Sequence, residues 1–248
     1  MRRLLGVFVT LLITGFNINM YAQGGCATGF ADHNWYFGDQ GQGIQFSKNQ
    51  SMEDFVPTAT LNIGGTAVAS DPSTGTVLFY SDGLQVYDIT NTAMANGNLS
   101  GNTSGNQPVA ICRNPANQDQ YFLFTNTAND ALAGIIQYTI IDMSLTGNAV
   151  FPKPALGAID ITNKNQATGI TNASEAMIVV ANATTDGFWL ITHENGSTNY
   201  LVMGINNAGV VQPATTVALG AITQASNISY HSATNRLAVT SQANGEDV

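Results

Sequence analysis

The stretch "VASDPSTGTVLFYS" at residues 68–81 decides the fold, because the rest of the chain repeats its plan. Two short alternating segments rich in β-branched and aromatic residues flank a turn of Asp, Pro, Ser, Thr and Gly, which predicts a β-hairpin. In the turn, Pro72 fixes φ and Gly75 accepts a positive φ. Three later segments share the plan: "AICRNPANQDQYFLFT" (110–125), "IVVANATTDGFWLIT" (178–192) and "NISYHSATNRLAVTS" (227–241).

The repeat predicts the architecture. Equivalent positions of the four hairpins are separated by 44, 67 and 48 residues, and they are Phe79, Leu123, Leu190 and Ala238. Two of these spacings fit a propeller blade of about 40–50 residues. A second apolar pair is expected in each of 83–99, 134–150 and 199–211, with a loop insertion at 151–176. We therefore predict an all-β chain, a β-propeller of about 45-residue, four-stranded blades, with a β-sandwich as the alternative.

The fourth unit stops after its first hairpin, so the propeller is expected to be incomplete at its C-terminal end, near Val248. The segment "WYFGDQGQGIQF" (35–46) could supply at most two strands to close the ring. Because an open end leaves an unpaired strand edge, we expect residues 23–248 alone to self-associate or fray.

Residues 1–22, "MRRLLGVFVTLLITGFNINMYA", have the layout of a signal peptide, with Arg2 and Arg3 before an apolar run that ends at Phe16. The apolar run is too short to span a bilayer. We predict cleavage after Ala22, a propeller-like repeat domain over residues 23–248, and a secreted or cell-surface location without membrane insertion. An N-terminal membrane anchor and lipidation at Cys26 are the alternatives.

Charge excludes two classes of partner. The chain has a net charge of −9, and removal of the leader leaves five basic against sixteen acidic residues, a net charge of −11. Nucleic acid and anionic membrane surfaces both favour clustered Lys and Arg, so neither is an expected partner. Charged residues make up only 9% of the chain, and its polarity comes instead from Asn, Thr, Ser, Gln and Gly.

Three recurring elements carry a resemblance: "NWYFG" at 34–38, "FYSDG" at 79–83 and "MANG" at 94–97. With them, residues 33 to about 145 resemble the N-terminal region of large secreted Bacteroidota surface proteins. These include adhesins and gliding-motility-associated proteins exported by the type IX secretion route. The resemblance implies a propeller-like repeat domain that is followed, in full-length relatives, by PKD-type modules and a sorting domain. It implies no catalytic residues.

The sequence predicts no catalytic, cofactor-binding or metal-binding residues. His33, His193 and His231 lie in different repeats and lack ligand partners at metal-binding spacing. No G-x-S-x-G motif is present. Ca²⁺ is the only ion with any support, from the oxygen-rich turns "DPSTG" and "NPANQD". Cys26 and Cys112 fit an oxidising compartment, either as one disulfide or as two separate thiols.

Alternation assigns the aromatic residues to faces. Trp35 and Phe37 share a face and are expected in the core, whereas Tyr36 points the other way, towards a neighbouring blade or a ligand. Trp189 is also expected in the core rather than as a sugar-stacking platform. Phe79 and Leu123 are predicted to be core residues, and Phe122 to be less buried.

The predicted function is a non-catalytic binding or adhesion module of an exported cell-surface protein, with an extracellular glycan or protein as its partner. The alternative is a secreted glycan-active hydrolase on the same fold, since a fold does not fix a function. Carboxylates gathered around a central cleft would favour the hydrolase. A lining of Asn, Ser and Thr would favour binding.

Overall fold

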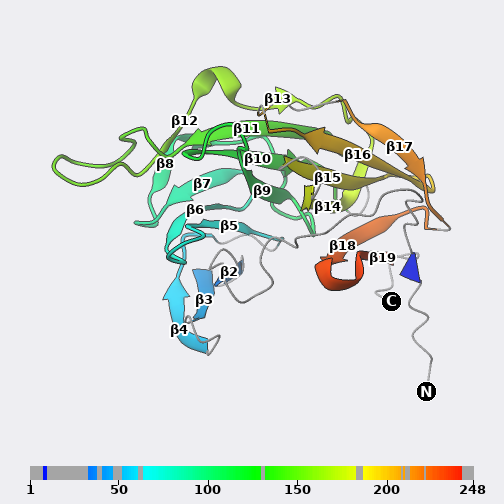
Figure 1. Cartoon of the computed structure of the whole chain (residues 1–248), viewed down its shortest axis with the longest axis horizontal. Helices are drawn as coiled ribbons and strands as arrows, with labels where there is room; N and C mark the ends of the chain where they lie inside the picture. Colours follow the sequence, from blue (N-terminus) through cyan, green and yellow to red (C-terminus); the bar gives the residue numbers. More distant parts are fainter. Residues whose placement is uncertain are drawn as a thin grey trace.

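The computed structural model describes residues 8–9, 33–37, 41–46, 52–60, 64–129, 132–182, 187–207, 209, 213–220 and 222–241. In these ranges the chain consists of β-strands, connecting turns and two 3₁₀ turns, η2 (Ile161–Asn163) and η3 (Ser232–Thr234). None of the described segments is a helix long and apolar enough to cross a membrane. The all-β prediction is confirmed (Figure 1).

The described strands form four hydrogen-bonded sheets, and the largest, of nine strands, consists of two antiparallel parts joined by the parallel pair β8–β12. We number these two parts separately, which gives sheets 1 to 5 in chain order. Sheet 1 contains β2 (Asn34–Phe37), β3 (Gln42–Phe46) and β4 (Met52–Pro57). Sheet 2 contains β5 (Ala67–Ser70), β6 (Val77–Ser81), β7 (Gln85–Asp88) and β8 (Ala93–Asn98). Sheet 3 contains β9 (Val109–Arg113), β10 (Gln120–Asn126), β11 (Ile136–Asp142) and β12 (Ala158–Ile159), with β13 (Gln166–Ala167) paired to β11. Sheet 4 contains β14 (Ala173–Asn182), β15 (Gly187–Glu194), β16 (Asn199–Ile205) and β17 (Thr215–Ala218). Sheet 5 contains β18 (Ala225–His231) and β19 (Arg236–Ser241), with β1 (Phe8–Val9) on the edge of β19.

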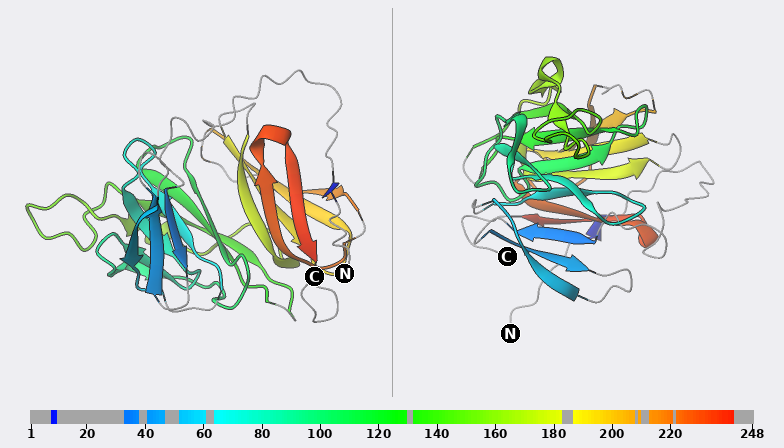
Figure 2. Two further views of the ribbon diagram at one scale, coloured as in Figure 1. Left: turned by 90° about the horizontal axis from the view of Figure 1, so that it is seen from below. Right: turned by 90° about the vertical axis from the view of Figure 1, so that its left-hand side faces the viewer.

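Successive sheets are linked through their first strands. The first strands of successive sheets contact one another, β2 with β5, β5 with β9, β9 with β14, and β14 with β18. From each first strand the sheet runs outward as a meander, and β8 and β12 meet in one parallel pair, Ala95 with Ala158. Sheets 1 and 5 lie at the two ends of this succession, as Figures 1 and 2 show. Antiparallel sheets packed face to face in this way are consistent with both the predicted β-propeller and the alternative β-sandwich.

The predicted positions of the four repeated hairpins are confirmed. The four predicted hairpins are β5–β6, β9–β10, β14–β15 and β18–β19. The equivalent positions Phe79, Leu123, Leu190 and Ala238 all lie in the second strand of their sheet. Sheet 1 is an additional unit, because β2 pairs with β3 and β3 pairs with β4 to form a separate sheet.

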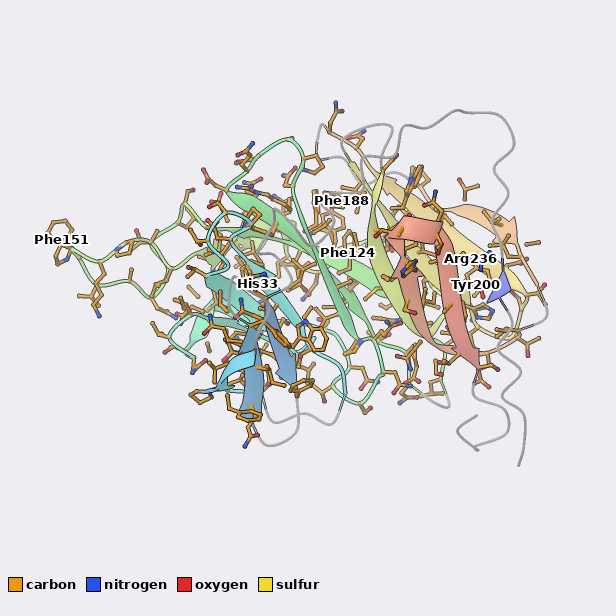
Figure 3. All side chains as sticks on the ribbon, turned by 60° about the horizontal axis from the view of Figure 1, so that its bottom comes forward. His33, Phe124, Phe151, Phe188, Tyr200 and Arg236 are labelled. Atoms are coloured by element: carbon orange, nitrogen blue, oxygen red, sulfur yellow. The ribbon has the colours of Figure 1, made fainter. Side chains whose placement is uncertain are left out.

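The fourth strands of sheets 3 and 4 lie later in the chain than predicted. They are β12 and β17, rather than parts of 134–150 and 199–211. After β11, Asp142 Oδ1 accepts the Ser144 N–H at 2.9 Å and turns the chain out of the sheet. Residues 143–157 then form a projecting loop with Phe151 near its tip, 94% exposed (Figure 3).

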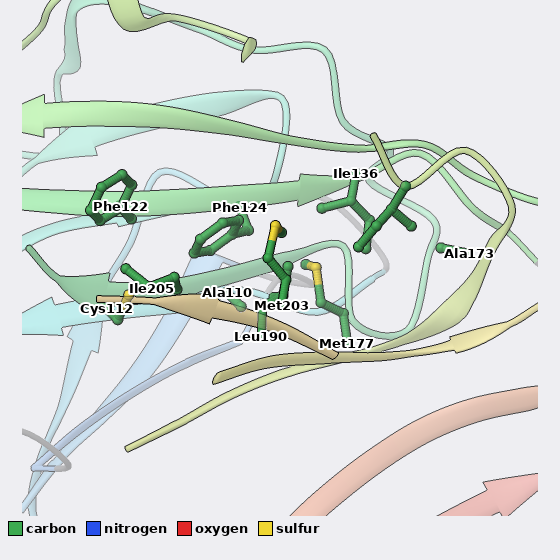
Figure 4. Packing of buried hydrophobic residues seen from close by; sticks show 11 residues of the cluster. Ala110, Cys112, Phe122, Phe124, Ile136, Ala173, Met177, Leu190, Met203 and Ile205 are labelled. Atoms are coloured by element: carbon green, nitrogen blue, oxygen red, sulfur yellow. The ribbon is translucent and has the colours of Figure 1, made fainter. Parts of the chain in front are cut away.

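Three apolar clusters lie between the sheets, and they form the core. Between sheets 2 and 3 lie Phe79, Val86, Tyr121, Leu123 and Ile141. Between sheets 3 and 4 lie Phe122, Phe124, Met177, Leu190 and Met203 (Figure 4). Between sheets 4 and 5 lie Ala176, Tyr200, Ala225 and Ile228. A sheet inside the stack is therefore covered on both faces.

This stacking confirms two burial predictions and overturns a third. Phe79 and Leu123 are fully buried, as predicted. Phe122 does point away from Leu123, but it is only 1% exposed, because sheet 4 covers its side of β10. The prediction that Phe122 is less buried is therefore wrong.

In sheet 1, residues that were predicted to be buried are exposed. Tyr36 packs edge-on against Tyr80 of sheet 2, with ring centroids 4.8 Å apart, which confirms its predicted contact with a neighbouring blade. Trp35 and Phe37 point the other way and are 55% and 47% exposed, so their assignment to the core is wrong. Trp189 is also exposed, at 37%, and its core assignment is wrong as well.

The predictions for the two ends of the chain fall mostly on residues outside the described ranges. Of the predicted signal peptide, residues 1–22, only Phe8–Val9 is described, as the strand β1 paired with Leu237 and Ala238. Cys26 and Val248 also lie outside the described residues. Cys112 is a free thiol buried in the cluster between sheets 3 and 4.

Candidate functional site

The connection between β8 and β9 is the point at which the sheets are tied together. We call residues 101–108, "GNTSGNQP", the hub segment. On one side it binds the chain that leads into β5: the Gly64 N–H donates to Thr103 O at 2.8 Å, and the Gly65 N–H donates to Gly105 O at 3.2 Å. The Gly101 N–H also donates to Gly83 O in the β6–β7 turn at 3.0 Å.

The hub segment reaches sheets 3, 4 and 5 through two amide side chains. Asn102 Nδ2 donates to the carbonyl oxygens of Thr127 and Ala128 after β10, at 3.3 and 3.2 Å. Gln107 Oε1 accepts the N–H of Met177 at 3.1 Å and that of Ile228 at 2.8 Å. Gln107 Nε2 returns a bond to Ile228 O at 2.9 Å. A single glutamine therefore joins β14 to β18.

Glycine is required here because backbone lies directly on backbone. A Cβ on Gly101 would lie 2.3 Å from Gly83 O, and one on Gly105 would lie 2.9 Å from Ala128 O. Real Cβ contacts are longer than these distances, so a side chain at either position would push the connections apart.

Beneath the hub segment lies a buried carboxylate, Glu175 of β14. Its Oε2 accepts a hydrogen bond from Asn106 Nδ2 at 2.8 Å. The side chain of Asn106 is exposed, as is that of Ser104 two residues earlier in the hub segment. The sequence analysis missed Glu175, although an acidic residue inside an apolar strand segment was the available signal.

Other buried polar groups near the hub segment are engaged in holding turns. Asn126 Nδ2 donates to Ser174 O at 2.7 Å, and its Oδ1 accepts the Ala128 N–H at 3.0 Å. Asp82 Oδ1 accepts the N–H groups of Leu84 and Gln85 at 3.0 and 2.8 Å. At the surface of the hub segment, the exposed Ser104 hydroxyl donates to Asn102 Oδ1 at 2.7 Å, and the exposed Asn106 donates to Glu175.

The histidines occupy three different sheets. His33 lies just before β2, His193 lies in β15, and His231 ends β18. His193 is buried, its Nε2 donates to Ile222 O at 3.0 Å, and desolvation lowers its pKa. His231 is exposed and bonds Thr234 Oγ1 at 2.8 Å. Within the described part of the chain, no three His, Cys, Asp or Glu side chains are grouped so that they could hold a metal ion.

The turns considered for Ca²⁺ use oxygen atoms for their own backbone. Asp71 Oδ1 accepts the N–H groups of Ser73 and Thr74 at 2.8 and 3.1 Å, and the Ser73 hydroxyl at 2.5 Å. The side-chain hydrogen bond from Ser73 is the main cause of the lowered pKa of Asp71. In "NPANQD", Asn114 Oδ1 accepts the Ala116 N–H at 2.9 Å.

A separate cavity of about 440 Å³ lies on sheet 5. It is lined by Ser229, Tyr230, His231, Thr234, Arg236, Leu237 and Ala238. Arg236 supplies a positive charge to this wall, in contrast to the neutral surface of the hub segment.

Comparison of the chain with known protein families, with curated proteins and with solved structures finds no match.

Proposed function

We propose that this chain is a non-catalytic binding module of an exported cell-surface protein, and that the hub segment binds a neutral, hydroxyl-rich ligand such as an oligosaccharide. The observation that carries the proposal is the pair of exposed side chains, Ser104 and Asn106, on a connection held rigidly by four sheets. Amide and hydroxyl groups both donate and accept hydrogen bonds, as sugar hydroxyls require. A site held in place before binding loses little entropy when it binds.

The state of the nearby carboxylates supports binding over hydrolysis. Glycoside hydrolysis needs two carboxyl groups about 5–10 Å apart, flanking the scissile bond. Glu175 is bonded to Asn106, and Asp82 is bonded to two backbone N–H groups of its own turn. A glycan-active hydrolase remains the second candidate, with Glu175 as its general acid, because a buried acid is the type of group that such chemistry uses.

Export is part of the same proposal. The basic and apolar layout of residues 1–22 supports it, together with the low charge and the richness in Asn, Thr, Ser and Gly. The resemblance to secreted Bacteroidota surface proteins supports a cell-surface location reached by the type IX route.

The test is a binding screen on an array of neutral, uronic-acid and sialylated oligosaccharides, followed by calorimetric titration of the best binder. Ser104→Ala and Asn106→Ala should each weaken binding about tenfold or more, equal to about 1.4 kcal/mol. Thr216→Ala and Asn227→Ala, at exposed positions on sheets 4 and 5, are the matched controls.

Three outcomes would count against the proposal. The first is binding to no sugar class on the array, and the second is equal affinity in the hub variants and the controls. The third is release of reducing sugar from the bound oligosaccharide. If Glu175→Gln abolished that release, the hydrolase would be the correct function.

A further inference from the structure

The outer face of sheet 1 carries a continuous apolar surface. Strand register places Trp35 opposite Ile44, and Ile44 opposite Phe55, in one row across β2, β3 and β4. Phe37 and Phe46, two residues away along their strands, lie on the same side. Phe46 also contacts Trp35 edge-on, with ring centroids 5.2 Å apart. We call these five residues the aromatic face.

The aromatic face is turned away from the rest of the stack. Sheet 1 uses its other face against sheet 2, through the Tyr36–Tyr80 ring contact and through Asn34 Nδ2, which donates to Ser70 Oγ at 3.0 Å and to Gly75 O at 2.7 Å. Phe55 is 63% exposed, more than either Trp35 or Phe37. Grouped exposed aromatic side chains of this kind mark interaction surfaces.

The other sheets show what covers a face of this composition. Each of the three apolar clusters is closed by a second β-sheet that packs face to face on the first. Side chains such as Phe122 and Phe79 are fully removed from solvent in this way. The aromatic face has the same composition, and it is therefore suited to the same type of partner, a flat β-sheet.

We propose that the aromatic face is a dimer interface, on which the same face of a second copy of this chain docks around a two-fold axis. None of its five side chains is charged, so these side chains can meet their own copies across the axis without opposing like charges among them. Docking on the exposed side of sheet 5 of a second copy would instead bury Arg236 and His231 against apolar rings, which is costly. The pairing therefore closes as a dimer.

The size of the face sets the strength of the dimer. Three strands about 4.8 Å apart, each about five residues long at about 3.3 Å per residue, cover a few hundred Å². Stable complexes bury about 800 Å² on each partner, so this dimer is weak and depends on concentration.

Sedimentation equilibrium of the whole chain over a wide concentration range tests the proposal. The wild type should pass from monomer to dimer, and Trp35→Ser and Phe55→Ser should each weaken dimerisation about tenfold or more. Phe151→Ser is the matched control, since Phe151 is also exposed but lies on the loop at 143–157. Thermal melting of each variant shows that the fold is retained.

Fluorescence adds a second measurement, because the chain has only two tryptophans, Trp35 and Trp189. In a Trp189→Phe background, the emission of Trp35 should shift to shorter wavelength as the chain dimerises. A monomer at all concentrations would overturn the proposal. So would dimerisation that Trp35→Ser leaves intact, or a shift of Trp35 emission by an oligosaccharide without any change in mass.

Discussion

Phe122→Ala should destabilise the protein as much as Phe79→Ala does, although the two side chains lie in different clusters. Phe122 stands between sheets 3 and 4, where its ring lies 6.2 Å from that of Phe124 and 5.8 Å from that of Tyr138. Phe79 stands between sheets 2 and 3, with its ring 5.3 Å from that of Tyr121. Both are fully enclosed, so each truncation leaves a cavity that the neighbouring sheets cannot easily fill.

The magnitude follows from the buried area. A fully buried Phe side chain removes about 150 Å² or more of apolar surface from water, which corresponds to about 4 kcal/mol at about 25 cal/mol per Å². Phe→Ala substitutions in cores cost about 3–5 kcal/mol once the cavity is included. Phe151→Ala, on the projecting loop, should change stability by no more than about 0.5 kcal/mol.

Urea unfolding monitored by circular dichroism measures the three variants under the same conditions. The free energy of unfolding is taken from the midpoint and the slope, and an unchanged slope shows that the comparison is valid. A loss of under about 1 kcal/mol for Phe122→Ala, beside a loss of about 3–5 kcal/mol for Phe79→Ala, would refute the packing of sheet 4 on sheet 3.

Three further predictions concern single groups. Burial raises the pKa of the Cys112 thiol, so this thiol should be unreactive in the folded protein. In a Cys26→Ser variant, a disulfide reagent at pH 8 should therefore react with Cys112 only after unfolding. Rapid reaction in the native protein would contradict the burial of Cys112. The hydrogen bond from Ser73 lowers the pKa of Asp71, so its contribution to stability is present above about pH 4 and is lost as the pH falls. Asp71→Asn should therefore reduce the acid-induced fall in Tm, and an unchanged fall would exclude this turn as a source. Gly101→Ala places a Cβ 2.3 Å from Gly83 O, so it should lower the free energy of unfolding by about 1–3 kcal/mol in the same urea assay. An unchanged free energy of unfolding would show that the hub segment and the β6–β7 turn separate easily.

The strands and hairpins were predictable because their signals are local. In 68–81 and 110–125, period-2 alternation and turn residues such as Pro72 specify the hairpin with no knowledge of the rest of the chain. The same local logic correctly placed Phe79 and Leu123 on inward faces. It misplaced the fourth strands of sheets 3 and 4, because a two-residue strand such as β12 has too few residues for alternation to show.

The candidate site was not predictable, because distant contacts build it. Asn106 and Glu175 are 69 residues apart in the chain, and Gln107 and Ile228 are 121 residues apart. Neither pair has a motif, and the hub segment itself looks like an ordinary polar loop. Only the succession of first strands β9, β14 and β18 brings these groups together.

The errors at Phe122 and at Trp35 share one physical cause. Alternation shows which residues of a strand share a face, but it does not show whether a face is covered, because another sheet does the covering. Inside the stack both faces are covered, so Phe122 is buried despite pointing away from Leu123. At the end of the stack, among the sheets that the structure describes, only the face of Tyr36 meets another sheet, and Trp35 is exposed. The apolar composition that predicted a core at residues 35–37 therefore has the same meaning inside the stack and at its end. In both places it indicates a face on which a second sheet can dock. For sheet 1, a second copy of the chain can supply that sheet.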